Sequence, residues 1–209
     1  MANDLFVELQ EKLEGKKVRI VFPEAYDERV LEAAVKLSAT SYVQPVLVGK
    51  KEKVEEIAQP LFLNVSGIEF VDHENYEKYD EMVAKFVERR AGKVNEEKAR
   101  ELLQDVNYFG TMLVYMGEVE GLVSGAIHST GDTVRPALQI IKTKPGVSRT
   151  SGAFIMSRNA SRFIFADCAI NTSIDAQGLA EIAVESAKTA KAFNINPKVA
   201  MLSFSTYGS

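Results

Sequence analysis

The stretch that decides the fold is residues 121–154, GLVSGAIHSTGDTVRPALQIIKTKPGVSRTSGAF. Its first part, residues 121–127, is apolar and predicts a buried strand. A short polar turn follows, and residues 134–141 predict an amphipathic helix with Arg135 and Pro136 in its first turn. A strand, a polar turn and a helix N-terminus in this order are typical of a ligand site at the edge of an open α/β sheet.

The polar turn contains groups that favour an anion. Unpaired N–H groups and the positive end of a helix dipole attract negative charge. The hydroxyls of Ser129, Thr130 and Thr133 add hydrogen-bond donors, and the guanidinium of Arg135 suits a phosphate group. The same residues also fit a helix cap at Asp132 or Thr133 beside a solvated Arg135. The local pattern alone leaves both interpretations open.

The composition excludes several classes of protein. The chain has 209 residues, of which 46% are hydrophobic and 26% charged, and a net charge of −4, which argues against nucleic acid as the main partner. No apolar run approaches the ~18 residues that span a membrane. The charged N-terminus lacks the apolar region of a signal peptide, so we expect a cytoplasmic protein.

Cysteine and histidine are scarce in the sequence. The single cysteine, Cys168, excludes a disulfide within the chain and agrees with a reducing compartment. The two histidines, His73 and His128, are far apart, and no Cys/His cluster has the spacing of metal ligands. We therefore expect no metal site.

Predicted strands and helices alternate along the chain, which indicates an α/β fold with a doubly wound, mostly parallel sheet. The predicted strands are residues 17–22, 45–48, 68–71, 121–127, 152–156, 163–166 and 199–204. The predicted helices are residues 4–13, 28–38, 51–58, 79–91, 95–105, 108–117, 134–141 and 176–193, with Asp27, Asn95 and Asp175 as N-caps.

A change of composition predicts two domains. The segment KPGVSRTSG, residues 144–152, is rich in Gly, Pro and Ser, and it separates an N-terminal α/β domain, residues 1–147, from the start of a second α/β domain, residues 148–209. The second part has about 60 residues, which is marginal for this architecture. Its last predicted strand, residues 199–204, has no helix after it. The hypothesis is that a C-terminal portion of a longer protein is missing.

Long motifs in this sequence resemble the phosphate acetyl/butyryl transferases, and the resemblance covers all 209 residues in one register. The motifs are VFPEAYDERVLEAA at residues 21–34, YFGTMLVYMGEVEGLVSGA at 108–126, VSGAIHSTGDTVRPALQIIKTKPGVSRTSGAFIM at 123–156, FADCAIN at 165–171 and VAMLSFST at 199–206. Members of this family are longer than this chain, which agrees with the hypothesis of a missing portion.

The resemblance implies a two-domain fold related to isocitrate and isopropylmalate dehydrogenases, an active site between the domains, and a homodimer. It also implies an acyltransferase that converts acetyl-CoA and phosphate reversibly into CoA and acetyl phosphate. CoA is then a substrate, and no metal or other cofactor takes part. The expected partners are these small molecules, without nucleic acid or membrane.

The resemblance assigns roles to individual residues. Arg135 and Arg90 would be catalytic, with Arg135 holding phosphate or the phosphoryl group of acetyl phosphate. The residues that would bind substrate are Ser129, Thr130, Asp132 and Thr133 in the first polar loop, and Ser205, Thr206 and Gly208 in a second loop that could hold part of CoA.

The sequence departs from the family pattern in two ways. Family members usually carry a lysine where this chain has Tyr207, and the family's catalytic Ser–Arg pair and base Asp lie in the missing portion. The 209 residues are therefore expected to be poorly active alone.

Four more residues near these motifs have both a functional and a structural interpretation. Cys168 would be a nucleophile in an acetyl-enzyme mechanism, but the pattern favours a buried small residue near the site. His128 is a candidate ligand or base, or a hydrogen-bonded histidine at a strand end. Lys142 and Lys144 could attract CoA phosphates, or they could complement the dipole at a helix C-terminus.

Three alternatives to the acetyltransferase remain. The first is a non-catalytic regulatory domain that senses acyl-CoA, although such domains usually follow another enzyme. The second is phosphate butyryltransferase, which has the same chemistry and a wider acyl pocket. The third, a dehydrogenase of the related fold, would need a nicotinamide fingerprint and acidic metal ligands, which the sequence does not show.

Overall fold

The computed structural model describes residues 5–158 and 161–202. These residues form two compact units: a larger one, Leu5–Lys142, and a smaller one that follows from Thr143. Each unit has its own secondary structure and is described by itself. The predicted domain boundary after residue 147 stays a prediction for the complete protein.

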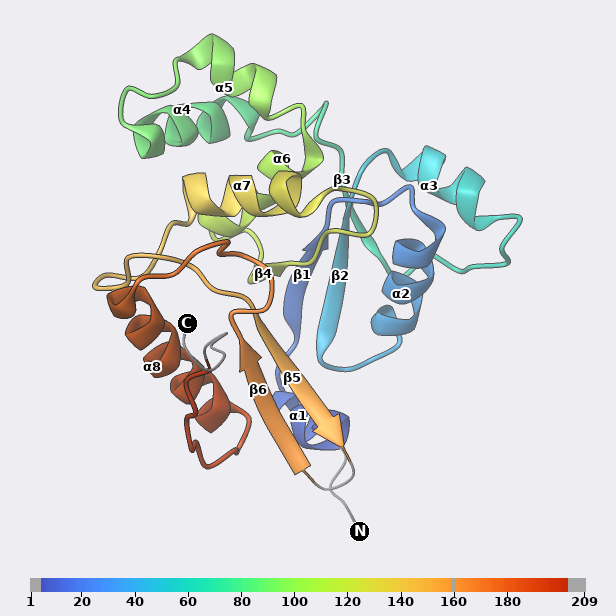
Figure 1. Ribbon diagram of the computed structural model, residues 1–209. Helices are drawn as coiled ribbons and strands as arrows, with labels where there is room; N and C mark the ends of the chain where they lie inside the picture. The colour runs from blue at the N-terminus through green and yellow to red at the C-terminus, as the bar shows by residue number, and fades with distance from the viewer. Residues whose placement is uncertain (1–4, 159–160, 203–209) are drawn as a thin grey trace. The chain divides into compact units, whose positions relative to one another are not determined.

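The larger unit is built on a parallel four-stranded sheet in the order β3-β2-β1-β4 (Figure 1). Its strands are β1 (Val18–Phe22), β2 (Val43–Val48), β3 (Glu69–Val71) and β4 (Gly121–Leu122). In the parallel register, Val18 pairs with Val43 and Ile20 pairs with Gly121. The order shows that the chain builds the sheet outward from β1 in one direction and then returns to add β4 on its other side.

Helices cover both faces of this sheet, because successive strand residues point to opposite sides. Val21 and Val46 belong to one buried cluster with α4, α5, α6 and α7, while Phe22 and Leu47 belong to another with α2 and α3. The helices of this unit are α1 (Leu5–Leu13), α2 (Glu28–Ser38), α3 (Lys51–Ala58), α4 (Tyr79–Arg90), α5 (Glu96–Leu102), α6 (Val106–Tyr115) and α7 (Thr130–Ile140). The prediction of an α/β fold with a parallel sheet is confirmed.

Local capping explains where several helices begin. Asp27 accepts hydrogen bonds from the N–H groups of Arg29 and Val30, so α2 begins at the predicted residue. Asn95 caps α5 as predicted. Asp105 caps α6, which therefore begins two residues before the predicted start.

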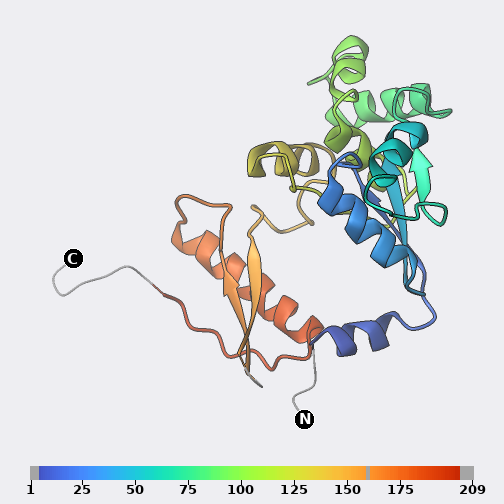
Figure 2. The same cartoon turned by 90° about the vertical axis from the view of Figure 1, so that its right-hand side faces the viewer.

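The smaller unit consists of a β-hairpin and one long helix. Strand β5 (Ala153–Arg158) pairs antiparallel with β6 (Ser161–Ala166), and α8 (Ala176–Ala192) lies along the hairpin (Figures 1 and 2). Asp175 caps α8 through the N–H of Gly178, as predicted. Consecutive strands of this kind pair antiparallel, so the parallel arrangement predicted for the chain applies to the larger unit alone.

Two predicted strands are wrong. The strand predicted at residues 121–127 begins at the predicted residue but ends at Leu122. The N–H of Val123 still bonds to Val21, but from Gly125 onward the N–H groups bond to the Glu24 carboxylate, and Ile127 is 63% exposed. The strand predicted at 199–204 is absent over residues 199–202, and Leu202 is 86% exposed. Residues 203 and 204 lie outside the described part of the chain.

None of the helices in the described ranges combines the length and the apolar character needed to cross a membrane.

Candidate functional site

The candidate site lies between β1 and β4, where the order in which strands are added to the larger sheet reverses. The connections after β1 and β2 run through α2 and α3 on one face, whereas the connection to β4 runs through helices on the other face. In open α/β sheets, ligands bind beyond the carboxyl ends of the strands at such a reversal. Here the segment after β1 contains Glu24, and the segment after β4 is residues 123–129. Both segments meet at the same edge.

Glu24 organises this edge. Its side chain is 1% exposed and its carboxylate accepts a hydrogen bond from Nδ1 of His128 at 2.7 Å. It also accepts hydrogen bonds at 2.8–3.0 Å from the backbone N–H groups of Gly125, Ala126, Ile127 and His128. A single carboxylate from the end of β1 therefore fixes four consecutive residues after β4, a role that the sequence analysis missed.

The same contacts set the charge of Glu24. Burial alone would raise the pKa of this carboxyl group. The N–H groups of Ile127 and Ala126 and the His128 side chain act in the opposite direction and lower the pKa to about 2. Glu24 is thus an anion at neutral pH. Of the backbone N–H groups in the polar turn that the sequence analysis expected to favour an anion, that of His128 is taken by this carboxylate.

Helix α7 begins earlier than predicted. Its N-cap is Ser129, whose Oγ accepts the N–H of Asp132 at 3.2 Å and donates to Asp132 Oδ2 at 2.6 Å. The predicted caps, Asp132 and Thr133, therefore lie inside the first turn, and Arg135 and Pro136 lie in the second turn. A Ser followed three residues later by Asp is a known N-terminal signature, and that signal could have given the correct start.

The start of α7 still leaves N–H groups for a ligand. The first N–H groups of an α-helix have no acceptor within the helix, which here concerns Thr130 and Gly131. Thr130 and Thr133 also line a hollow of about 210 Å³, together with Ser124, Gly125, His128 and Val134. The Oγ1 atom of Thr133 is buried and has no hydrogen-bond partner among the described atoms.

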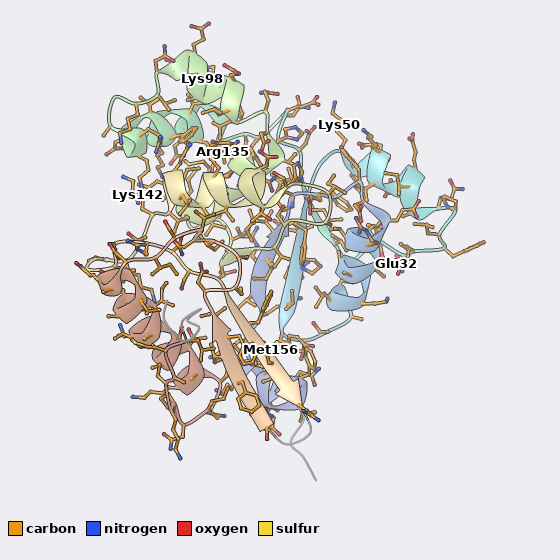
Figure 3. All side chains as sticks on the ribbon, in the orientation of Figure 1. Glu32, Lys50, Lys98, Arg135, Lys142 and Met156 are labelled. Atoms are coloured by element: carbon orange, nitrogen blue, oxygen red, sulfur yellow. The ribbon has the colours of Figure 1, made fainter. Side chains whose placement is uncertain are left out.

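Arg135 lies on the surface of α7 (Figure 3), and its guanidinium contacts Asp132. The Nη1–Oδ1 distance is 3.1 Å, and the Arg135 and Asp132 side chains are 55% and 47% exposed. Asp132 has a lowered pKa because of the hydroxyl of Ser129 and the charge of Arg135, with burial acting in the opposite direction. Arg135 is thus held by an exposed carboxylate. Lys142 lies just beyond the end of this helix (Figure 3).

Arg90 approaches α7 from the other end. Its Nη1 donates to the carbonyl oxygen of Gln139 at 3.2 Å, and its Nε is buried without a partner among the described atoms. Tyr108 donates to Oε1 of Gln139 at 3.1 Å. Burial raises the pKa of Tyr108, while the positive charges of Arg135 and Arg90 oppose this rise. The positive charges of Arg135 and Arg90 therefore both lower the pKa of Tyr108.

A second hollow borders the same segment. Its volume is about 260 Å³, and its lining is mostly apolar, formed by Phe22, Glu24, Arg29, Val30, Ala33, Val123, Ser124 and Ala126. Arg29 donates to the carbonyl oxygen of Ala126 at 2.8 Å and also pairs with Asp27. Segment 123–129 is therefore held by Glu24 after β1 and by Arg29 of α2, and it lines both hollows.

Cys168 belongs to the smaller unit. It is half-buried, and its N–H donates to the carbonyl oxygen of Gly152 at 3.1 Å. The neighbouring Asp167 accepts N–H groups from Gly152, Ile170 and Asn171. Burial would raise the pKa of Asp167, but these hydrogen bonds lower it. Both histidines of the chain lie in the larger unit, so no histidine of the smaller unit accompanies Cys168.

Part of the predicted site lies beyond what is described. Ser205, Thr206, Tyr207 and Gly208 are outside the described residues. Within the described ranges, no group of three or more His, Cys, Asp and Glu side chains could hold a metal ion.

Comparison with known proteins settles the family. The model of the phosphate acetyl/butaryl transferase family matches residues 4–209. This chain belongs to that family. The result agrees with the resemblance carried by the motifs around Glu24 and His128.

Relatives within the phosphate acetyl/butaryl transferase family are closely similar to this chain. A phosphate acetyltransferase from Staphylococcus aureus is 63% identical over 206 residues, which are 99% of this chain and 63% of the relative. One from Staphylococcus epidermidis is 62% identical over the same share of each chain. The chain thus spans less than two thirds of the length of these relatives.

Two solved structures of phosphotransacetylases are also similar to this chain. A phosphotransacetylase from Staphylococcus aureus has a TM-score of 0.90 and 62% identity, and it matches 98% of this chain and 62% of its own. A phosphotransacetylase from Streptococcus pyogenes has a TM-score of 0.92 and 54% identity, with 98% of this chain and 63% of its own chain matched.

Proposed function

We propose that the protein transfers an acetyl group reversibly between CoA and phosphate, as acetyl-CoA + phosphate = CoA + acetyl phosphate. The observation that carries the proposal is the 63% identity to a phosphate acetyltransferase over nearly the whole chain. We propose CoA, acetyl-CoA, phosphate and acetyl phosphate as substrates, without a metal or other cofactor. A homodimer and a cytoplasmic location are parts of the same proposal, taken from the resemblance to the family.

In this reaction, the larger unit would bind the phosphoryl group. The N–H groups at the start of α7 and the hydroxyls of Thr130 and Thr133 would donate to its oxygens, and Arg135 would leave Asp132 to pair with it. Arg90 would add positive charge from the other end of α7. Holding phosphate, which accepts the acetyl group, in one position promotes the transfer because it orients the reacting atoms.

The acyl-chain preference is open between acetyl and butyryl, and no feature of the described residues favours the longer chain. The named relatives favour acetyl. A regulatory domain that senses acyl-CoA without catalysis is the remaining alternative.

One experiment tests the proposal directly. Cleavage of acetyl-CoA in the presence of arsenate should be measured on the 209-residue chain and on a version extended to the length of its relatives. We expect cleavage by the extended version and little by the short chain. Binding of acetyl-CoA without any cleavage by the extended version would favour the regulatory alternative, and faster cleavage of butyryl-CoA would favour the butyryltransferase.

A further inference from the structure

Glu24 and His128 form a buried carboxylate–imidazole pair at the edge of the larger sheet. The Nδ1–Oε1 distance is 2.7 Å, and the side chains of Glu24 and His128 are 1% and 24% exposed. The two residues are 104 positions apart in the sequence, so the pair exists only because β1 and β4 are neighbours in the sheet.

The pair fixes the state of the imidazole ring. Because Glu24 is ionised at neutral pH, its carboxylate oxygens accept hydrogen bonds and donate none. The proton in the contact must therefore be on Nδ1 of His128. The Nδ1–H form leaves Nε2 as the nitrogen that is available to another molecule.

The side chain of His128 lies at a hollow beside the start of α7. His128 lines the hollow of about 210 Å³ that Thr130 and Thr133 also line, and this volume has room for several water-sized groups. Thr133 contributes a buried hydroxyl with no partner among the described atoms. The hollow thus combines an imidazole nitrogen, hydroxyl groups and the start of a helix.

This combination suits a tetrahedral oxyanion. Hydroxyl and N–H donors satisfy its oxygens, and Nε2 either accepts from a protonated phosphate oxygen or, when protonated itself, donates to an ionised one. The carboxylate of Asp132 lies in the same helical turn, where it accepts a hydrogen bond from the hydroxyl of Ser129 at 2.6 Å.

We propose that His128 contacts the phosphate group directly through Nε2 and that Glu24 is the positioning residue that presents this nitrogen. The inference rests on the proposed function, which supplies phosphate as the substrate. It assigns a binding role to a histidine for which the sequence left a binding role and a structural role open.

The ring nitrogens can be followed individually by NMR. The chain contains two histidines, and His73 is an internal control because its ring contacts Phe109 in another part of the larger unit. In the 209-residue chain labelled with ¹⁵N, we expect His128 to be in the Nδ1–H form. Inorganic phosphate should shift its Nε2 resonance in a saturable manner and leave His73 unchanged.

Two substitutions separate positioning from binding. His128→Asn places an amide donor near the position of Nδ1, so the bond to Glu24 can persist while Nε2 is lost. We expect phosphate affinity to fall about tenfold or more, in line with one lost hydrogen bond to a charged group. In Glu24→Gln, we expect both tautomers of His128 to be populated, which gives mixed Nδ1–H and Nε2–H signals. Phosphate binding should weaken as well. Unchanged amide shifts in β1 and β2 would show that either variant is folded.

The outcomes distinguish this inference from the proposed function. If phosphate shifts the amides of Thr130 and Gly131 but not Nε2 of His128, the inference is wrong and the function is untouched. If CoA shifts Nε2 and inorganic phosphate does not, the assignment to phosphate is also wrong. Acetyl transfer by the extended version with its natural His128 decides the proposed function separately, since that measurement does not ask which residue contacts phosphate.

Discussion

A Cβ atom placed on Gly152 would lie 2.8 Å from the sulfur of Cys168. The two residues also share a backbone hydrogen bond, from the N–H of Cys168 to the carbonyl oxygen of Gly152. Side chains do not approach so closely, so either the sulfur or the backbone must move if Gly152 is replaced. The sulfur of Cys168 thus occupies the space that a side chain at residue 152 would need.

Gly152→Ala should destabilise the smaller unit because the new methyl group overlaps the sulfur. Overpacking of this kind costs about 1–3 kcal/mol. Cys168→Ala in the same chain should restore most of this loss. The measurement is the urea midpoint of a double-mutant cycle, with Gly67→Ala as the control, because the nearest atom there is 3.9 Å away. Additive effects of the two substitutions would show that the contact does not limit packing.

Cys168→Ala should leave acetyl transfer largely intact in a version of the protein with the length of its relatives. The structure gives Cys168 a packing contact with Gly152 and no histidine within its unit as described. A nucleophilic cysteine needs a base to form its thiolate. The measurement is the acetyl-CoA cleavage rate together with mass spectrometry. A loss of several orders of magnitude with a trapped acetyl-cysteine would restore the nucleophile hypothesis.

Glu24 should make the stability of the larger unit depend on pH. Its pKa falls from 4.5 to about 2 on folding, so the folded state binds fewer protons between these values. The stabilisation is complete above pH 4.5 and is lost as the pH falls through about 2. At about 1.36 kcal/mol per pH unit, this amounts to about 3 kcal/mol.

Glu24→Gln provides the check on that pH dependence. The free energy of unfolding should be measured from hydrogen exchange in β1 and β2 between neutral and acidic pH. We expect the variant to be less stable near neutrality, with the difference shrinking in acid. Parallel pH curves for the two proteins would contradict the role of the Glu24 carboxylate.

Arg89 and Arg90 offer a matched pair at the end of α4. Arg89 donates to the carbonyl oxygens of Ile140 and Ile141, which are contacts that stabilise a helix C-terminus. Arg90 makes one such contact, to Gln139, and keeps an unpaired Nε. In the extended version, Arg90→Gln should lower the acetyl transfer rate at least tenfold at saturating substrate, about 1.4 kcal/mol in the barrier.

Arg89→Gln, by contrast, should lower the melting temperature and leave the rate nearly unchanged. The rate and the thermal midpoint are measured on the same preparations. Equal losses of rate for both variants would mean that Arg90 acts through the position of α7, as Arg89 does, and has no separate role in the reaction.

The sequence predicted elements whose causes are local. Asp27 begins α2 because its carboxylate bonds to the N–H groups just after it, and such a cap is visible within a few residues. Ser129 is also a local cap, but the proline seven residues later suggested a later start for α7. The helical proline is tolerated at position 136, which the rule for first-turn prolines did not anticipate.

What the sequence could not predict depends on contacts between distant residues. Glu24 meets residues 125–128 across more than 100 positions, and no local pattern shows that a carboxylate will take their N–H groups. The apolar run 121–127 therefore looked like a strand, although only its start pairs with β1. The same reason applies to residues 199–202, whose apolar pattern also looked like a strand although these residues form none and Leu202 is 86% exposed.

Arg135→Lys should not be a conservative change. Lysine keeps the charge but replaces a planar fork of donors with a single ammonium group. If Arg135 binds phosphate through two parallel bonds, the variant loses one of them, and such bonds contribute about 1.5–3 kcal/mol each. This corresponds to a loss of roughly 10- to 150-fold in affinity at about 1.4 kcal/mol per decade.

The selectivity of that loss is the decisive measurement. In the extended version, the affinity for phosphate and acetyl phosphate should fall while that for CoA stays the same. Arg100→Lys is the matched control, since Arg100 is also an exposed arginine paired with carboxylates, those of Asp80 and Glu96. If Arg135 serves only its exposed pair with Asp132, both variants should change affinity by well under tenfold and stability by about 0.5 kcal/mol or less. A loss confined to CoA would instead assign Arg135 to the other substrate.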